Sequence, residues 1–226
     1  MPGWIWEAQI AAFSRRHRVV ALDPRGQGKS DIPARGYDHI RRGDDIGDVL
    51  AAMGARPALV VAWSLGVLDT LAYLVHDTSC WVEITTLLIP GENDSDDELR
   101  QLSRWVYREL GPQVPLHFTA FHPDWKMTDK PRTPHVTLIR ARRIAMDEGL
   151  RHVYVGNVQD KARQSTYCHG CGERVIGRDS YVLSEWRLDD TGRCIRCGTQ
   201  CPGVFDGPRG HWGAKRQPVR IGVRTA

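Results

Sequence analysis

Four cysteines in the last third of the chain are spaced for metal binding. They form two Cys-x-x-Cys-Gly turns, Cys168 to Gly172 and Cys194 to Gly198, with 22 residues between Cys171 and Cys194. The two-residue gap lets backbone amides point at the sulfurs, and the glycine permits the tight turn that brings both thiolates to one ion. The spacing predicts a tetrahedral structural zinc ion with four ligands, Cys168, Cys171, Cys194 and Cys197. Such a closed site leaves no open position for a substrate.

The distribution of the cysteines favours a metal over disulfide bonds. Five of the six lie between 168 and 201, and the preceding 167 residues contain only Cys80. Iron is the main competing ion, and a redox dithiol or a disulfide pair is the other alternative. Cys201 is either a spare thiol or an alternative ligand, and His169, inside the first turn, is expected to be exposed. A module this small needs the metal to replace missing apolar burial.

A second set of reactive side chains follows apolar runs that are typical of strands. Ser64, His122 and Asp124 all come at or just after such runs, and the carboxyl ends of parallel strands form the usual ligand crevice of an open α/β sheet. One hypothesis is therefore covalent ester hydrolysis, with Ser64 attacking, His122 as general base and Asp124 or Asp23 orienting it. The structural alternative is that Ser64 begins a helix and His122 caps a strand.

A metal outside the cysteine turns is a second catalytic hypothesis. Its ligands would come from His117, His122, Asp124 and His135, for hydrolysis of an ester or phosphoester. Strand alternation counts against this set, because His117 and His122 are an odd number of residues apart and would face opposite sides of a regular strand.

Five β-rich runs alternate with helical patterns and must position these side chains. We expect an open, mostly parallel sheet of about five strands with helices on both faces, followed by a small zinc ribbon. The division expected is residues 1–80, 81–164 (sharing one sheet with 1–80), a zinc ribbon over 165–207 and a basic tail over 208–226. The strand runs are Val19 to Leu22, Ala58 to Trp63, Glu83 to Ile89, Leu116 to Phe121 and His152 to Val155.

The helices between these runs are indicated by apolar stripes and by their end signals. One stripe runs from Ile46 to Met53 and another from Leu68 to Val75. Ser95 to Glu98 has the pattern of a capping box that opens a further helix, and Thr133-Pro134 starts another that stops at Gly149.

Residues 4 to about 76 resemble the α/β-hydrolase family. The resemblance lies in Trp4 to Glu7, in Arg18 to Ser30 with its Asp-Pro-Arg-Gly-Gln-Gly-Lys-Ser, and in Ala62-Trp63-Ser64-Leu65-Gly66. The last pentapeptide corresponds to the nucleophile elbow, with Ala62 in place of the first glycine. The resemblance implies that Ser64 is the nucleophile and that the Leu65 N–H is one oxyanion donor. The family's acid and histidine would lie in a C-terminal half to which this sequence shows no match.

Residues from about 81 to 222 resemble the C-terminal portion of radical SAM proteins of the AmmeMemoRadiSam system. The matching segments are Glu83 to Gly91, His117 to Asp124, Tyr154 to Val158 and both cysteine turns. The cysteine motif for that family's iron–sulfur cluster is absent from this sequence, so neither an iron–sulfur cluster nor SAM is expected and radical SAM chemistry is excluded. The two resemblances meet between Asp77 and Val82, which suggests a chimera.

The composition and charge of the sequence limit the expected location and partners of the protein. No apolar run approaches the ~20 residues of a membrane span, and the N-terminus lacks the pattern of a signal peptide, so we expect a cytoplasmic protein without membrane contact. The net charge is +4, and the last residues carry Arg209, Lys215, Arg216, Arg220 and Arg224. This tail is expected to be solvated; weak nucleic-acid contact is the alternative.

Exposed sheet edges would favour pairing between chains, so a homodimer is a further expectation. Together these patterns favour a zinc-binding chimeric protein that acts as a low-specificity hydrolase of carboxyl or phosphate esters, with a small ester or phosphoester as substrate. The alternative is a non-catalytic zinc-stabilised α/β scaffold.

Overall fold

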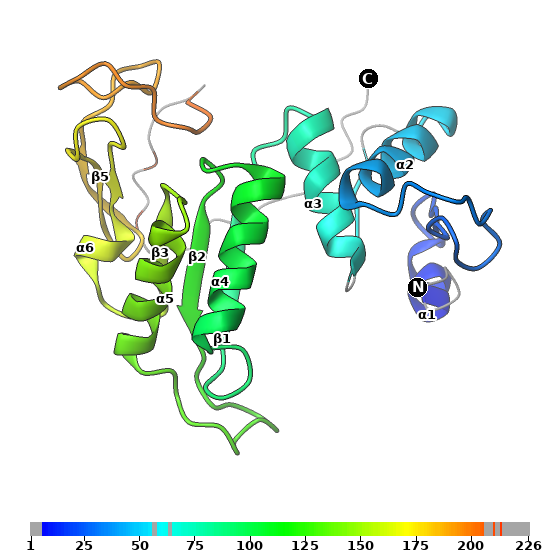
Figure 1. Cartoon of the computed structure of the whole chain (residues 1–226), viewed down its shortest axis with the longest axis horizontal. Helices are drawn as coiled ribbons and strands as arrows, with labels where there is room; N and C mark the ends of the chain where they lie inside the picture. Colours follow the sequence, from blue (N-terminus) through cyan, green and yellow to red (C-terminus); the bar gives the residue numbers. More distant parts are fainter. Residues whose placement is uncertain (1–5, 56–57, 63–64, 206–209, 211–212, 214–226) are drawn as a thin grey trace. The chain divides into compact units, whose positions relative to one another are not determined.

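The computed structural model describes residues 6–55, 58–62, 65–205, 210 and 213. The chain divides into two compact units, Met1–Val82 and Glu83–Ala226, which are described separately. The first holds helices α1 (Glu7–Phe13), α2 (His39–Ala52) and α3 (Leu65–Asp77). The second holds a parallel layer and a cysteine-containing ribbon (Figure 1).

Helices α2 and α3 pack closely because α2 carries glycines at the contact. Asp38 caps α2 by accepting a hydrogen bond from the Arg41 N–H at 2.9 Å. Gly43 and Gly47 are buried on the face toward α3, where a Cβ on Gly47 would come within 2.6 Å of the Tyr73 ring. Tyr73 is itself buried. The two helices predicted from their apolar stripes are therefore present and form the core of the first unit.

The prediction of two strands in the first unit was wrong for the residues that the structure describes. Residues 18–24 and 58–62 form no strand, and Trp63 lies outside the described residues. Val20 is 37% exposed and Leu59 is 92% exposed. A strand is stabilised by hydrogen bonds to a neighbour, and the described part of this unit supplies no strand for these apolar runs to pair with.

The second unit begins with a three-stranded parallel sheet. Strands β1 (Ile84–Leu88), β2 (Leu116–Ala120) and β3 (Val153–Gly156) pair in that order, with Ile84 opposite Leu116 and Leu116 opposite Val153. Helix α4 (Asp96–Trp105), continued by a π-helical segment (Val106–Leu110), joins β1 to β2, and α5 (His135–Asp147) joins β2 to β3. Side chains buried between sheet and helices form the core: Leu88, Leu99, Val106, Leu116, Phe118, Leu138 and Ala141.

Helix α4 begins at its predicted signal, and α5 begins and ends at its predicted signals. The Ser95 hydroxyl accepts the Glu98 N–H at 3.3 Å and donates to the Glu98 carboxylate at 2.6 Å, which forms the capping pair at the start of α4. Pro134 precedes α5, and Gly149, with φ of 103°, follows its end.

The helices of this layer lie on one face, which corrects the prediction of helices on both faces. Helix α4 contacts α5, and α5 also contacts β2 and β3 (Figure 1). Because the strands follow one another in a single direction across the sheet, crossovers of the same hand place both helices on the same side. The parallel α/β architecture itself is confirmed, with three strands in the described parallel sheet rather than about five.

The ribbon completes the second unit. A short helix α6 (Lys161–Gln164) leads into the antiparallel strands β4 (Thr166–Tyr167), β5 (Arg174–Asp179) and β6 (Val182–Trp186). Its small core consists of Cys168, Val175, Ile176, Leu188, Cys194 and Cys201. Half of these buried residues are cysteines, so apolar burial alone is meagre. Over the described residues of both units, no helix is long and apolar enough to cross a membrane.

Candidate metal centre and catalytic residues

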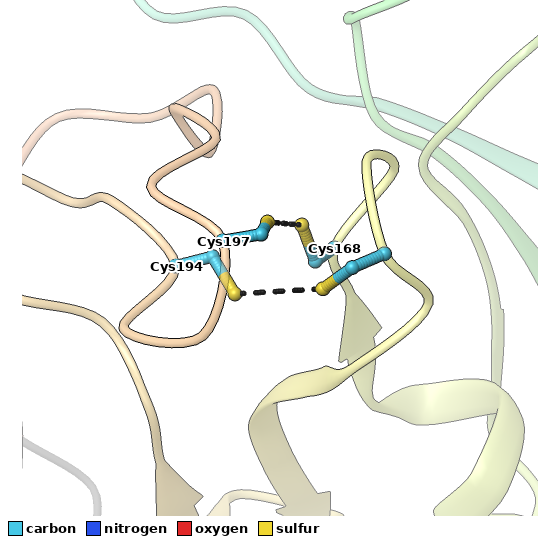
Figure 2. A group of neighbouring side chains, drawn as sticks. Cys168, Cys194 and Cys197 are labelled. Carbon is cyan, nitrogen blue, oxygen red and sulfur yellow. Dashed lines mark hydrogen bonds between the residues drawn. The ribbon is translucent and has the colours of Figure 1, made fainter.

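The four predicted cysteines come together at one point of the ribbon. Their sulfur atoms all lie within 4.8 Å of one another. Cys168 Sγ is 3.6 Å from Cys197 Sγ, and Cys171 Sγ is 3.8 Å from Cys194 Sγ (Figure 2). These separations are far longer than the ~2 Å of a disulfide bond, and all four thiols are free. The arrangement is that of thiolates around a single metal ion.

Each cysteine turn is closed by the same backbone hydrogen bond. The Gly172 N–H donates to the Cys168 carbonyl at 2.8 Å, and the Gly198 N–H donates to the Cys194 carbonyl at 2.8 Å. Both glycines are left-handed, with φ of 73° and 74°. This conformation carries little cost for glycine and strains any residue with a Cβ. The equivalent geometry explains why glycine follows each Cys-x-x-Cys pair.

A glutamate between the two turns joins them from outside, a feature that spacing alone did not predict. The Glu173 carboxylate accepts from Arg196, within the second turn, at 2.8 Å and from Arg187 at 2.7 Å. The arginines are 65% and 47% exposed, so each ion pair contributes little to stability by itself. Their effect is to hold one turn opposite the other.

Thr199 lowers the pKa of one of the four thiols. Its hydroxyl oxygen lies 3.2 Å from Cys197 Sγ, and this hydrogen bonding lowers the pKa of Cys197 to about 6. Cys201 is buried in the ribbon core outside the group of four, and burial raises its pKa to about 11. His169 is exposed, as expected.

The described residues do not assemble the predicted serine triad. Ser64 lies outside them, and Leu65 is the first residue of α3. His122 and Asp124 are both exposed in the loop after β2, and no hydrogen bond within the described part of the chain joins them. The Asp124 carboxylate instead accepts the Trp125 N–H at 2.7 Å. The catalytic roles of these residues stay predictions.

Asp23, the other predicted orienting group, accepts hydrogen bonds that hold a turn. Its carboxylate accepts the Lys29 N–H at 2.9 Å, and its carbonyl accepts the Ser30 hydroxyl at 2.6 Å. A Cβ on Gly28 would collide with the Asp23 carboxylate, which accounts for the glycine at that position. Arg25 in the same segment is ion-paired with Asp45 at 2.5 Å. The Asp-Pro-Arg-Gly-Gln-Gly-Lys-Ser motif is thus a folded loop.

Two of the three histidines of the alternative metal site are paired with carboxylates elsewhere. His117 Nε2 lies 3.0 Å from the Glu83 carboxylate, and its ring stacks on Tyr154. His135 Nε2 lies 2.9 Å from the buried Asp160 carboxylate. Among the described residues, the four cysteines are the only group of three or more His, Cys, Asp or Glu that brings ligand atoms together.

The first unit contains a histidine–carboxylate pair that the sequence did not reveal. His39 Nδ1 lies 2.9 Å from the Asp69 carboxylate, which also pairs with Arg42 at 2.9 Å. Asp69 is 3% exposed and lies on α3, five residues after Ser64. The signal that could have found it is weak: His39 and Arg42 are three residues apart, and so share a helix face.

The sequence of the chain matches a known family. A sequence model described as the alpha/beta hydrolase family matches residues 1–214. The chain belongs to this family. The folded Asp23 to Ser30 loop and α3, which begins directly after Ser64, fit the hydrolase pattern seen in the first third of the sequence.

Related proteins match the chain over part of their length. It is 44% identical over 126 residues to an uncharacterized protein of Methanocaldococcus jannaschii, covering 55% of this chain and 38% of that protein. It is 31% identical over 81 residues to 3-oxoadipate enol-lactonase 1 of Acinetobacter baylyi, covering 36% and 30%. An AB hydrolase superfamily protein of Bacillus subtilis is 28% identical over 92 residues, covering 38% and 34%.

The chain therefore spans between 30% and 38% of the length of these relatives. No solved structure matches the chain at a significant level.

Proposed function

We propose that Cys168, Cys171, Cys194 and Cys197 hold one structural zinc ion. The observation that carries this proposal is the spacing of the sulfurs. Four thiolates at the ~2.3 Å of a zinc–sulfur bond sit at tetrahedral corners about 3.8 Å apart. The 3.6 Å and 3.8 Å separations are close to that figure, and all four sulfurs lie within 4.8 Å of one another. Zinc bound there would tie β4 and β5 to the second turn and so stabilise a ribbon with little apolar core.

The test is a metal count on purified protein by inductively coupled plasma mass spectrometry. We expect one zinc per chain, and less than a tenth of that in Cys168→Ser or Cys197→Ser. Cys80→Ser is the matched control, since Cys80 is exposed and lies in the first unit. Cys201→Ala tests the fifth thiol and should retain zinc. Stoichiometric iron in place of zinc, or full metal content in Cys168→Ser, would refute the assignment.

The second candidate function is hydrolysis of small carboxyl or phosphate esters with low specificity. Membership in the α/β hydrolase family supports it, as does the position of Ser64 directly before α3. In this proposal Ser64 is the nucleophile and the Leu65 N–H is an oxyanion donor. Two histidines compete for the role of base: His122 with Asp124, as the sequence predicted, and His39, whose buried Asp69 partner orients its Nδ1.

A panel of activated carboxyl and phosphate esters, together with a fluorophosphonate probe, tests this proposal. We expect covalent labelling that disappears in Ser64→Ala. Comparison of His39→Ala with His122→Ala then identifies the base, because replacing the true base should lower kcat at least about a hundredfold. His76→Ala is the control. Equal labelling of wild type and Ser64→Ala would exclude this mechanism and leave the non-catalytic zinc-stabilised scaffold.

The origin of the second unit is part of the same proposal. We infer that residues from about 81 onward derive from a radical SAM protein of the AmmeMemoRadiSam system and were joined to a hydrolase fragment. The boundary between the compact units, after Val82, falls at the edge of the predicted junction. Without a cluster motif this unit would contribute βα units and a ribbon, and no radical chemistry. Separate expression of residues 83–226 tests it, since an independent unit should fold and bind zinc.

The expected surroundings of the protein follow from this proposal. A hydrolase of this kind would act on a small ester in the cytoplasm, and a homodimer would cover β1, which pairs only with β2 in the described sheet. The basic tail lies almost entirely outside the described residues, and its weak contact with nucleic acid is tested by salt dependence of binding.

A further inference from the structure

A cavity of about 270 Å³ lies in the second unit, and neither the four cysteines nor His122 line it. One wall is formed by α5 and by the start of β3. The other is formed by the ribbon, through Tyr167 and the glycine of the first cysteine turn, Gly172. A second hollow shares Arg142 and Tyr167 with it and opens beside Arg163. No role in zinc binding or ester hydrolysis involves this cavity.

Two arginines line the cavity without a neutralising carboxylate. Arg142 is half-buried on α5 and donates from its Nε to the Val153 carbonyl at 2.9 Å, which fixes the guanidinium over the start of β3. Arg151 is exposed at the cavity rim. Neither forms an ion pair with any carboxylate in the described part of the chain. Arg163 nearby differs, because its guanidinium pairs with Asp160 at 2.8 Å.

Keeping the guanidinium of Arg142 charged in this position costs free energy. Burial, together with the positive charge of Arg163, lowers its pKa, and the nearby Asp160 carboxylate offsets only part of this effect. Two positive charges that form no ion pair among the described residues match a dianion better than a single carboxylate. The fork of guanidinium N–H groups also fits the oxygens of a phosphate, which carries close to two negative charges near neutral pH.

The remaining walls suit an organic group attached to the anion. His152 is 3% exposed and lines the cavity, and its Nε2 is buried without a hydrogen-bond partner. Buried polar atoms are normally satisfied, so this nitrogen is suited to a ligand oxygen. Met146 and Tyr167 supply apolar surface beside it. The cavity volume is close to the lower end of small-molecule sites, which sets the size of the occupant.

We propose that this cavity binds a phosphate monoester of small size, with Arg142 and Arg151 holding the phosphate and with Met146 and Tyr167 covering the organic group. His152 contributes a neutral hydrogen-bonding group to the phosphate. The site is independent of Ser64, so it survives failure of the hydrolase proposal. It requires the ribbon wall, and the zinc-loaded full chain is therefore the protein to test.

Calorimetric titration with phenyl phosphate, inorganic phosphate and benzoate tests the site. We expect phenyl phosphate to bind, and to bind more tightly than inorganic phosphate or benzoate. Equal binding of inorganic phosphate would overturn the monoester assignment in favour of free phosphate. Equal binding of benzoate would overturn the argument from two positive charges, and no binding of phenyl phosphate at millimolar concentration would overturn the site.

Three variants distinguish the cavity from general surface charge. Arg151→Gln and Arg142→Gln should each weaken phenyl phosphate binding about tenfold or more, the effect of losing one hydrogen bond to a charged group. Arg143→Gln is the matched control, because Arg143 is an exposed neighbour on the same helix and changes the net charge equally. A similar loss in Arg143→Gln refutes the proposal. Arg151 is exposed, so its variant decides the question if Arg142→Gln is unstable.

Discussion

Removal of zinc should unfold the ribbon while leaving the parallel layer folded. The aliphatic core of the ribbon consists of Val175, Ile176 and Leu188, and each buried aliphatic side chain contributes about 1.5–3 kcal/mol. Structural zinc contributes about 10 kcal/mol or more. A bound zinc ion would therefore supply more stabilisation than the buried aliphatic side chains of the ribbon together. Its chelation should remove a quantity comparable to the whole stability of a typical domain, about 5–15 kcal/mol.

Amide hydrogen exchange measured by mass spectrometry can locate this unfolding. In the zinc-loaded protein, the Gly172 and Gly198 amides that close the two cysteine turns should be protected, because each donates a 2.8 Å hydrogen bond. After treatment with a chelator, both should exchange at the rate of an unfolded peptide. The Ile84 amide, which donates to Pro115 at the start of the parallel sheet, should stay protected.

Two controls accompany this experiment. Cys80→Ser should behave like the wild type before and after chelation, since Cys80 lies outside the ribbon. Readdition of zinc should restore protection of the cysteine turns. Continued protection of Gly172 and Gly198 in demonstrably metal-free protein would show that the ribbon folds without metal, and the reasoning from its small core would be wrong.

Three further predictions concern single residues. Gly172→Ala should retain zinc and lower Tm by roughly 2–4 °C, because the new Cβ meets no atom within 4 Å and only the left-handed backbone is strained, at about 1 kcal/mol. Asp69→Ala should cost about 3–5 kcal/mol in denaturant unfolding by leaving Arg42 buried and unpaired, whereas exposed Asp48→Ala should cost less than ~1 kcal/mol. Burial, with the charges of His169 and Arg151, lowers the pKa of His152 to about 4, below its ordinary 6.5. The contribution of neutral His152 to the free energy of unfolding, about 3 kcal/mol, is therefore complete above pH 6.5 and is lost as the pH falls toward 4. His152→Gln should lose that part of the acid sensitivity in pH-dependent unfolding, while the part due to zinc release remains; an unchanged pH profile would contradict the assignment.

Local signals predicted the helices well. The capping pair at Ser95, the proline before α5 and the apolar stripes of α2 and α3 each depend on interactions between residues close in the chain. The strands were predicted unevenly. The runs at Val19 and Leu59 are at least as apolar as those that became β1, β2 and β3, but only the latter three have partners in the described structure. Strand pairing joins distant residues, which periodicity cannot show.

The candidate metal centre was predictable because its four cysteines come from two short repeats of the same pattern. Two-residue spacing places a pair of thiols on one ion, whatever the rest of the fold does, and the glycine after each pair sets the left-handed turn. The ion pairs of Glu173 with Arg187 and Arg196 could not be predicted in the same way. Surface charges have many partners within reach, and only the folded ribbon selects among them.

The sequence by itself determined the four cysteines of the candidate metal centre, the start of α4, both ends of α5 and the family of the first third of the chain, because each depends on residue types at short, fixed spacings. Only the tertiary structure decided that His117 and His135 pair with Glu83 and Asp160 rather than with a metal. It alone placed Asp69 against His39 and brought Arg142 and Arg151 to one cavity. These groups are far apart in the chain, and their proximity follows from packing between elements, which no local pattern encodes.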